Sequence, residues 1–182
     1  MCFDKFEPGE KRKNCTLKRD ALVKKLIRMT DAIPDRIVAV TYNLSFASQL
    51  NMAMGSEKDF VEQCQRVRRD CYAAALDRIE DMSNTFKVDV IGIQEAEDAD
   101  MSAKIKSRVP FLDCHYRAGV WNDRVKKYVG ALLMWNSSKL GNRTHATTLN
   151  LDPDDGRVCG IVTTDKEITL IVAHFPWINR RA

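Results

Sequence analysis

Three polar residues, Asn43, Glu95 and His174, each follow a short apolar run of the sequence. A carboxylate such as that of Glu95 can hold Mg²⁺, which prefers oxygen ligands and keeps part of its shell for water and substrate phosphate. The amide of Asn43 offers a donor to a phosphate oxygen and an acceptor to a water or metal. His174 can donate to a phosphate oxygen or protonate a leaving oxygen, because the ordinary pKa of histidine lies near neutrality. Together the three residues would form half of a phosphate-ester site.

Each residue also has a simpler explanation. Polar residues end most strands because the chain there meets solvent. Taken singly, Asn43 is explained as a turn residue, Glu95 as a solvated carboxylate and His174 as a hydrogen-bonded histidine at a strand end. Only their common position at strand ends, where layered folds gather their chemistry, favours the functional interpretation.

The elements that must position these residues are predicted from apolar periodicity. The runs RIVAVTY and VDVIGIQ are nearly all apolar, which predicts strands at 36–42 and 88–94 that are covered on both faces. Further strands are expected at 129–135, 158–163 and 168–173, the last leading into His174, with a hairpin turn at Asp165-Lys166. His115, His145 and the segment 121–124 lie in stretches without this pattern, so surface loops are expected there.

Helical spacing of apolar residues predicts three helices. An amphipathic helix is expected at 17–29, one long helix from Phe60 to Met82, and a short helix at 100–108 that Pro110 stops. The order helix, strand, helix, strand and then a run of strands predicts one domain that contains both helices and sheets. Composition agrees, since 182 residues with 45% hydrophobic and 30% charged side chains suit a single soluble domain.

Composition also sets expectations about location and partners. No apolar run approaches the length that spans a bilayer, and no export signal precedes Lys13, so we expect an intracellular protein without a membrane span. The six cysteines form no C-x-x-C pair, which predicts reduced structural thiols. Residues 1–30 carry nine Lys and Arg against four Asp and Glu. This basic arm could contact nucleic acid, or be a solvated face.

Four local sequences, in order, resemble the opening motifs of the endonuclease/exonuclease/phosphatase superfamily: VAVTYNLSFA, VDVIGIQE, VGALLMWNSSKLG and ITLIVAHFPW. The resemblance covers about residues 36–177, and its most specific part is the strand followed by Gln94-Glu95. Within the superfamily, the sequence resembles deoxyribonuclease-like proteins and inositol polyphosphate 5-phosphatase-like proteins.

The resemblance implies a fold of the α/β class, of the α+β sandwich type, with two packed sheets flanked by helices. It also implies Mg²⁺- or Mn²⁺-dependent attack of water on phosphorus. By position Glu95 matches the metal-binding glutamate, Asn43 the asparagine near metal and phosphate, and His174 the histidine that contacts the phosphate or assists the leaving group. The implied substrates are DNA, RNA, phosphoinositides or sphingolipids, among which these residues do not discriminate.

The superfamily's later motifs, D-x-N and a closing S-D-H, do not follow Trp177. We therefore expect residues 1–35 to form an arm and helix, and 36–182 to be the N-terminal portion of such a domain, with an incomplete site. The inner face of the first sheet would then be exposed, and a partner or self-association would cover it. The alternatives are a non-catalytic module that binds nucleic acid or protein, and an unrelated α/β domain.

Overall fold

The computed structural model of the chain describes residues 21, 24–25, 35–44, 49–52, 58–68, 70–122, 127–152 and 157–174. The chain divides into two units, Met1–Arg36 and Ile37–Ala182. Most of the helix expected at 17–29 lies outside the described residues, but Ala21, Lys24 and Lys25 are helical.

The first sheet is mixed and has the strand order β1-β2-β4-β3. β1 (Ala39–Asn43) runs parallel to β2 (Val90–Gln94). β4 (Lys127–Trp135) is antiparallel to both β2 and β3 (Cys114–Asn122). The strands expected at 36–42, 88–94 and 129–135 are thereby confirmed with small shifts of their bounds.

The second sheet is an antiparallel meander in the order β5-β6-β7. Its strands are β5 (Arg143–Asp152), β6 (Arg157–Thr164) and β7 (Thr169–Ala173), with a turn at Asp165-Lys166 as expected. A one-turn helix, α6 (Ser137–Leu140), connects the two sheets.

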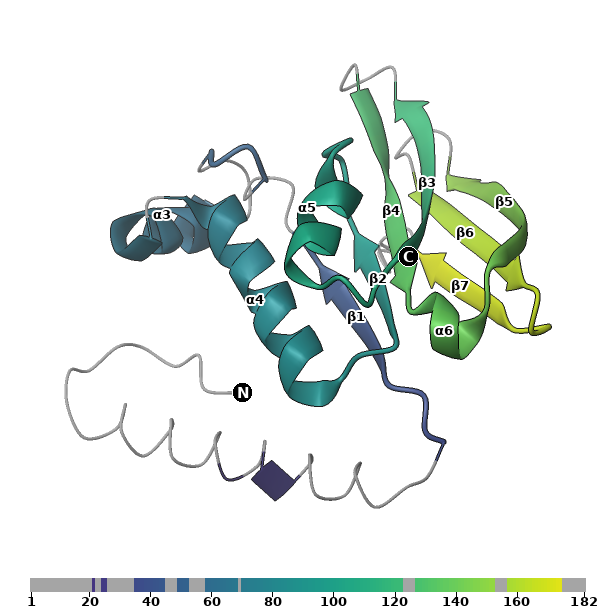
Figure 1. Cartoon of the computed structure of the whole chain (residues 1–182). Helices are drawn as coiled ribbons and strands as arrows, with labels where there is room; N and C mark the ends of the chain where they lie inside the picture. The colour runs from purple at the N-terminus through teal and green to yellow at the C-terminus, as the bar shows by residue number, and fades with distance from the viewer. Residues whose placement is uncertain are drawn as a thin grey trace, which may run out of the picture. The chain divides into compact units, whose positions relative to one another are not determined.

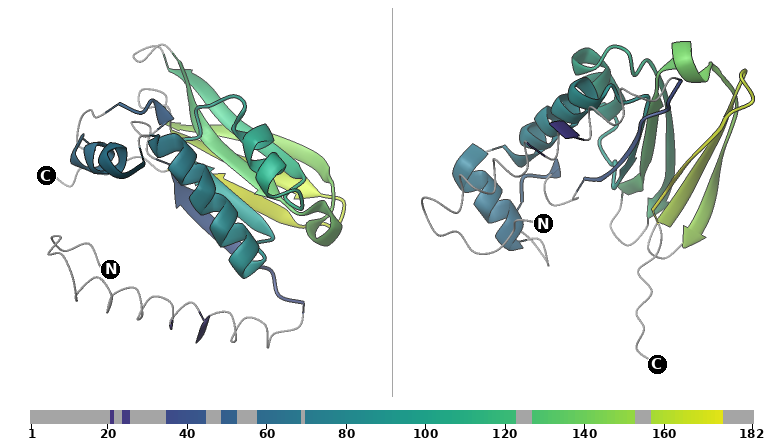
Figure 2. Two further views of the ribbon diagram at one scale, coloured as in Figure 1. Left: turned by 60° about the vertical axis from the view of Figure 1, so that its left-hand side comes forward. Right: turned by 90° about the horizontal axis from the view of Figure 1, so that it is seen from below.

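Three layers result, seen edge-on in the right-hand view of Figure 2. Helices α4 (Cys71–Phe86) and α5 (Met101–Arg108) cover one face of the first sheet, and the second sheet packs on the other face (Figure 1). The predicted class, an α+β fold of two sheets flanked by helices, is confirmed. The described part contains no helix long and apolar enough to cross a membrane.

Apolar residues alternate between the two faces of the central strands. Ile91 and Ile93 of β2 face the helices, while Val90 joins the core between the sheets. Burial on both faces explains why β2 reads as a continuous apolar run. The largest residue of the inter-sheet core is Trp135, whose indole nitrogen donates to the carbonyl oxygen of Gly141 at 2.9 Å.

The expected exposure of the first sheet's inner face is wrong for three of its strands. β6 lies against β3 and β4, and β7 lies against β2 and β4. β1 differs, because Ala39, Thr41 and Asn43 on its inner face are exposed. The prediction that β1 is covered on both faces is therefore wrong as well, since the described strands of the second sheet reach no further than β2.

Two strands were not predicted. β3 contains His115 and Trp121, and β5 contains His145, all in stretches expected to be loops. Both strands are rich in polar residues and lie at sheet edges, where each pairs with one described neighbour, β4 or β6. Their extended conformation depends on hydrogen bonding to these apolar neighbours, because their own sequences carry no strong strand pattern.

The long helix expected from Phe60 to Met82 is two helices, α3 (Lys58–Arg68) and α4. Asp70 adopts an extended conformation between them, and its side chain accepts a hydrogen bond of 2.9 Å from the backbone nitrogen of Ala73. Such a cap starts a new helix. Because apolar residues keep helical spacing across this break, periodicity alone does not reveal it.

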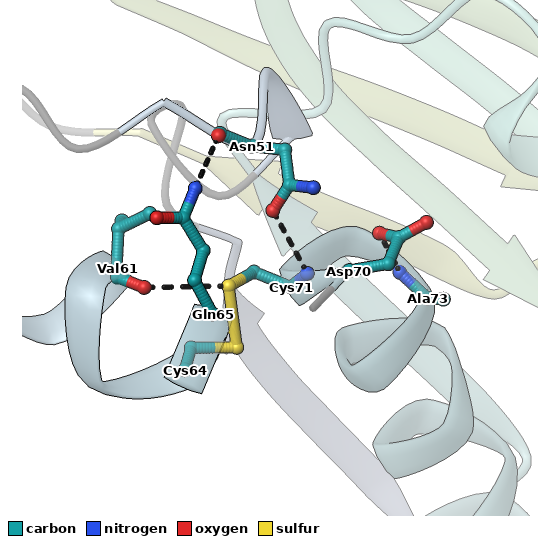
Figure 3. Close-up of a disulfide and its surroundings, with 7 residues drawn as sticks. All are labelled: Asn51, Val61, Cys64, Gln65, Asp70, Cys71 and Ala73. Carbon is teal, nitrogen blue, oxygen red and sulfur yellow. Dashed lines mark hydrogen bonds between the residues drawn. A yellow bond between two sulfur atoms is a disulfide. The ribbon is translucent and has the colours of Figure 1, made fainter. Parts of the chain in front are cut away.

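The break also brings two cysteines together. Cys64 of α3 and Cys71, the first residue of α4, form a disulfide with a Cα–Cα distance of 5.7 Å (Figure 3). The prediction of reduced thiols is wrong for this pair. The break between the two helices brings the side chains of Cys64 and Cys71, seven positions apart in the sequence, within bonding distance. Cys114 and Cys159 are free thiols.

Close approach of the two sheets depends on Gly160 of β6. A Cβ atom at this position would lie 2.8 Å from the Cβ of Ala118 and 3.3 Å from a methyl group of Val172. Both neighbours are buried between the sheets, so they have little room to move.

We predict that Gly160→Val lowers the free energy of unfolding by about 2 kcal/mol, the usual cost of overpacking a core. Urea unfolding of the purified chain measures this directly. Thr163→Val is the matched control on the opposite face of β6 and should leave stability nearly unchanged. Equal stability of the two variants would show that the sheets do not pack as described.

Candidate functional site

Strands from both sheets end at one edge of the sandwich. Asn43 ends β1 and pairs in parallel register with Gln94, which ends β2. Across the sandwich, a Cβ atom at Gly92 of β2 would lie 3.1 Å from a methyl group of Val172 in β7. The chain continues from Gly92 to Glu95 and from Val172 to His174 past this contact, so the two residues meet at the edge.

Glu95 and His174 are in contact there. Oε1 of Glu95 lies 3.6 Å from Nε2 of His174, and their side chains are only 21% and 16% exposed. Asn43 is exposed and lies on the inner face of β1, beside Gln94 rather than beside Glu95. The structure therefore brings Glu95 and His174 into contact and places Asn43 on the neighbouring strand end.

Glu95 has a left-handed backbone conformation, with φ of 57°. This conformation costs a residue other than glycine about 1 kcal/mol or more and persists only where its surroundings hold it. Ala96 donates to the carbonyl oxygen of Gly130 at 2.9 Å, and Glu97 donates to that of Glu95 at 3.1 Å. The chain bends at Glu95, and these two hydrogen bonds hold the bend.

Arg157, the first residue of β6, is a site residue that sequence patterns did not reveal. Its Nη1 lies 3.0 Å from Nδ1 of His174 and also contacts Nε2. The backbone of His174 donates to the carbonyl oxygen of Val158 at 2.9 Å, which aligns the strand ends. Nε of Arg157 is buried and has no hydrogen-bond partner among the described residues.

The surroundings of His174 disfavour its charged form. Burial, and then the positive charge of Arg157, lower the pKa of His174 from 6.5 to about 4. A pKa near neutrality was expected, and that expectation is wrong for this arrangement. At pH 7 the imidazole is neutral, so its contact with Glu95 is not an ion pair, and it can accept a hydrogen bond from the Arg157 guanidinium.

Side chains from the helix layer and from the first sheet itself hold the loop after Glu95. Arg117 of β3 donates to the carbonyl oxygen of Glu97. Tyr72 and Lys104 each donate to Oδ2 of Asp98 at 2.6 Å. Burial alone would raise the pKa of Asp98, but the hydrogen bonds from Lys104, Tyr72 and its own loop lower it below its ordinary value. The loop is thus tied to α4, α5 and β3.

The described residues include no group of three or more His, Cys, Asp or Glu side chains that could hold a metal. Mg²⁺ needs fewer, because it binds through one or two carboxylates and completes its shell with water and substrate phosphate. The half-buried carboxylate of Glu95 fits that role, with the exposed amide oxygen of Asn43 as a candidate second contact. The donor set fits Mg²⁺ better than a metal that requires nitrogen or sulfur ligands.

Comparison with known proteins identifies the fold but no family. No protein-family model matches the chain, and no curated protein matches it significantly. Among solved structures, a mannosyl-6-phosphatase from Bacteroides thetaiotaomicron is similar, with a TM-score of 0.52 and 17% identity. The match covers 80% of this chain and 54% of that one, so the chain spans about half the length of this structural neighbour.

The lowered pKa of His174 makes a prediction about stability. The unfolded chain takes up this proton near the ordinary pKa of 6.5, whereas the folded chain takes it up only near 4. Protonation therefore favours unfolding, and stability should fall as pH decreases from 6.5 to 4. In His174→Gln this part of the decline should be reduced by on the order of 2 kcal/mol, as measured by urea unfolding across this range.

His145→Gln, on exposed β5, is the matched control and should retain the wild-type pH dependence. If His174→Gln and wild type lose stability in parallel between pH 6.5 and 4, then His174 does not lie in the environment described.

Proposed function

We propose that the edge formed by Glu95, His174 and Arg157 is the phosphate-binding part of a site for Mg²⁺-dependent hydrolysis of phosphate esters. The substrate class would be a phosphodiester or phosphomonoester, as in nucleases and phosphatases. We also propose that the chain is related to the endonuclease/exonuclease/phosphatase superfamily, whose motifs its strand ends resemble. Glu95, His174 and Asn43 would then occupy the positions of that superfamily's site residues.

The observation that carries the proposal is the guanidinium of Arg157. It lies against a neutral histidine, its Nε is buried without a partner, and no carboxylate forms an ion pair with it among the described residues. A partly buried cation that forms no ion pair is costly, and binding of an anion would relieve that cost. Arginine in particular matches the oxygens of phosphate in a bidentate manner.

The neighbouring side chains suit a phosphate ester. Neutral His174 has one ring nitrogen available to carry a proton and donate to a phosphate oxygen. The negative charge of a bound phosphate would raise the pKa of His174 and so oppose the effect of Arg157. Asn43 could donate its amide hydrogens to the same group from the end of β1.

Glu95 would hold Mg²⁺ through its carboxylate, close to the phosphate held by Arg157 and His174. When bound, such an ion polarises phosphoryl oxygens and stabilises charge that develops on them. The left-handed turn at Glu95 supports this role, because a disfavoured conformation that is held at a strand end is common at functional sites. A structural neighbour that is a phosphatase agrees with phosphate-ester chemistry in general terms.

The proposal predicts Mg²⁺-dependent hydrolysis of bis(p-nitrophenyl) phosphate, p-nitrophenyl phosphate or plasmid DNA by the purified chain. Glu95→Gln removes the charge that would hold the ion and should lower kcat roughly 100-fold or more. Absorbance at 400 nm or loss of supercoiled plasmid reports the rate.

Glu167→Gln provides a close control, because Glu167 also has a positive φ, of 61°, and lies in the exposed β6–β7 turn. It should retain wild-type activity. A folded wild-type chain that hydrolyses none of the three substrates would contradict the proposal and favour a non-catalytic module. Binding of plasmid DNA without cleavage would then favour a module that binds nucleic acid.

A further inference from the structure

The side chain of Gln49 makes hydrogen bonds to four backbone groups. Its Nε2 donates to the carbonyl oxygens of Leu44, at 3.3 Å, and Glu95. Its Oε1 accepts from the backbone nitrogens of Glu97, at 3.1 Å, and Asp98, at 3.3 Å. A half-buried amide that uses both its donor and its acceptor sides in this way is held in one orientation.

These four groups follow β1 and β2, the two strands of the first sheet that end at the candidate site. Leu44 follows β1, and Glu95 to Asp98 follow β2. Because β1 and β2 are parallel, both loops leave the same edge of the sheet. One backbone hydrogen bond, from Leu44 to Gln94 at 3.1 Å, joins them directly, and Gln49 supplies the connection beyond the last residue of β2.

The direction of the Glu95 carboxylate depends on the backbone at this point. With φ at 57°, Glu95 is in a conformation that it leaves readily unless the adjacent peptide is held. Gln49 bonds the Glu95 carbonyl oxygen, and in the next two peptides it accepts from Glu97 and Asp98. It therefore orients the peptide that follows Glu95.

Gln49 belongs to a turn, residues 49–52, that hydrogen bonds hold in place. Within residues 49–52, the carbonyl oxygen of Asn51 accepts from Nε2 of Gln65 in α3 at 2.5 Å, and its Oδ1 accepts from the backbone of Cys71 at 3.1 Å (Figure 3). The Cys64–Cys71 disulfide joins the two helices that make these bonds. The turn thus has a fixed position from which Gln49 reaches the site.

We propose that Gln49 is a positioning residue for Glu95: it holds the left-handed turn that aims the carboxylate at the metal and phosphate position. The proposal rests on the function proposed above, since it assigns Gln49 a part in the same site. Gln49 touches neither substrate nor metal and acts only through the backbone of Glu95 to Asp98.

The test compares Gln49→Met, which keeps the length of the side chain and removes all four bonds, with Gln65→Met as the matched control. Gln65 supplies one of the two bonds to the turn and contacts none of the four backbone groups that Gln49 bonds. We expect the bond from the Cys71 backbone to Asn51 to keep the turn in place when Gln65 is replaced. Steady-state hydrolysis of bis(p-nitrophenyl) phosphate, the thermal midpoint and Mn²⁺ binding by electron paramagnetic resonance are measured for both. We expect Gln49→Met to lower kcat about 100-fold, with KM within a few-fold of wild type, since misplacing a reacting group by about 1 Å costs this much.

Mn²⁺ affinity should fall at least 10-fold in Gln49→Met and remain unchanged in Gln65→Met. The thermal midpoint should fall in both variants, and by more in Gln49→Met, which loses four hydrogen bonds rather than one. A purely structural role predicts instead that both variants lose activity only in proportion to stability. Equal kcat and equal Mn²⁺ affinity in the two variants would overturn the proposal.

Amide hydrogen exchange separates this proposal from the proposed function. Slow exchange at Asp98, whose amide bonds only Gln49 among the described residues, should be lost in Gln49→Met and kept in Gln65→Met, whether or not the chain hydrolyses phosphate esters. An inactive wild-type chain with this exchange pattern would refute the function and retain Gln49 as the residue that holds the loop. Unchanged exchange in Gln49→Met would refute the positioning role.

Discussion

Val172 of β7 packs against Gly92 of β2, and this contact between the two sheets determines which strand ends meet. Because Gly92 has no side chain, β7 can cross β2 closely enough for His174 to reach Glu95. Gly160 on the neighbouring strand allows the same close approach to Ala118. The candidate site therefore depends on small residues within the sandwich as much as on the polar residues at its edge.

Electrostatics at this edge follow from the same packing. Alignment of β6 with β7 places Arg157 against His174, and the cation together with burial lowers the pKa of the histidine to about 4. In the free protein the neutral histidine is a poor acid, whereas the half-buried guanidinium beside it is a good partner for an anion. A bound phosphate would oppose the effect of Arg157, since its negative charge would compensate the guanidinium and raise the pKa of His174.

Apolar strands and the residues that end them were readable from the sequence, because β2 and β4 are buried and their side chains are correspondingly uniform. β3 and β5 were not, since edge strands owe their conformation to the partner that they pair with. Arg157 and Gln49 carry no local signal, because the site residues that they contact, His174 and the segment after Glu95, are distant from them in the sequence. The break at Asp70, and with it the Cys64–Cys71 disulfide, is hidden by apolar spacing that continues through it.

The central claim is that Glu95, His174 and Arg157 form one phosphate site, and a nuclear magnetic resonance titration of the His174 ring tests it most directly. The pKa of His174 is measured in the free chain and at saturating inorganic phosphate with Mg²⁺. The account predicts a pKa of about 4 in the free chain that rises on binding, with the Glu95 amide and the Arg157 side chain shifting at the same phosphate concentration. A pKa of His174 that is the same with and without phosphate would contradict it.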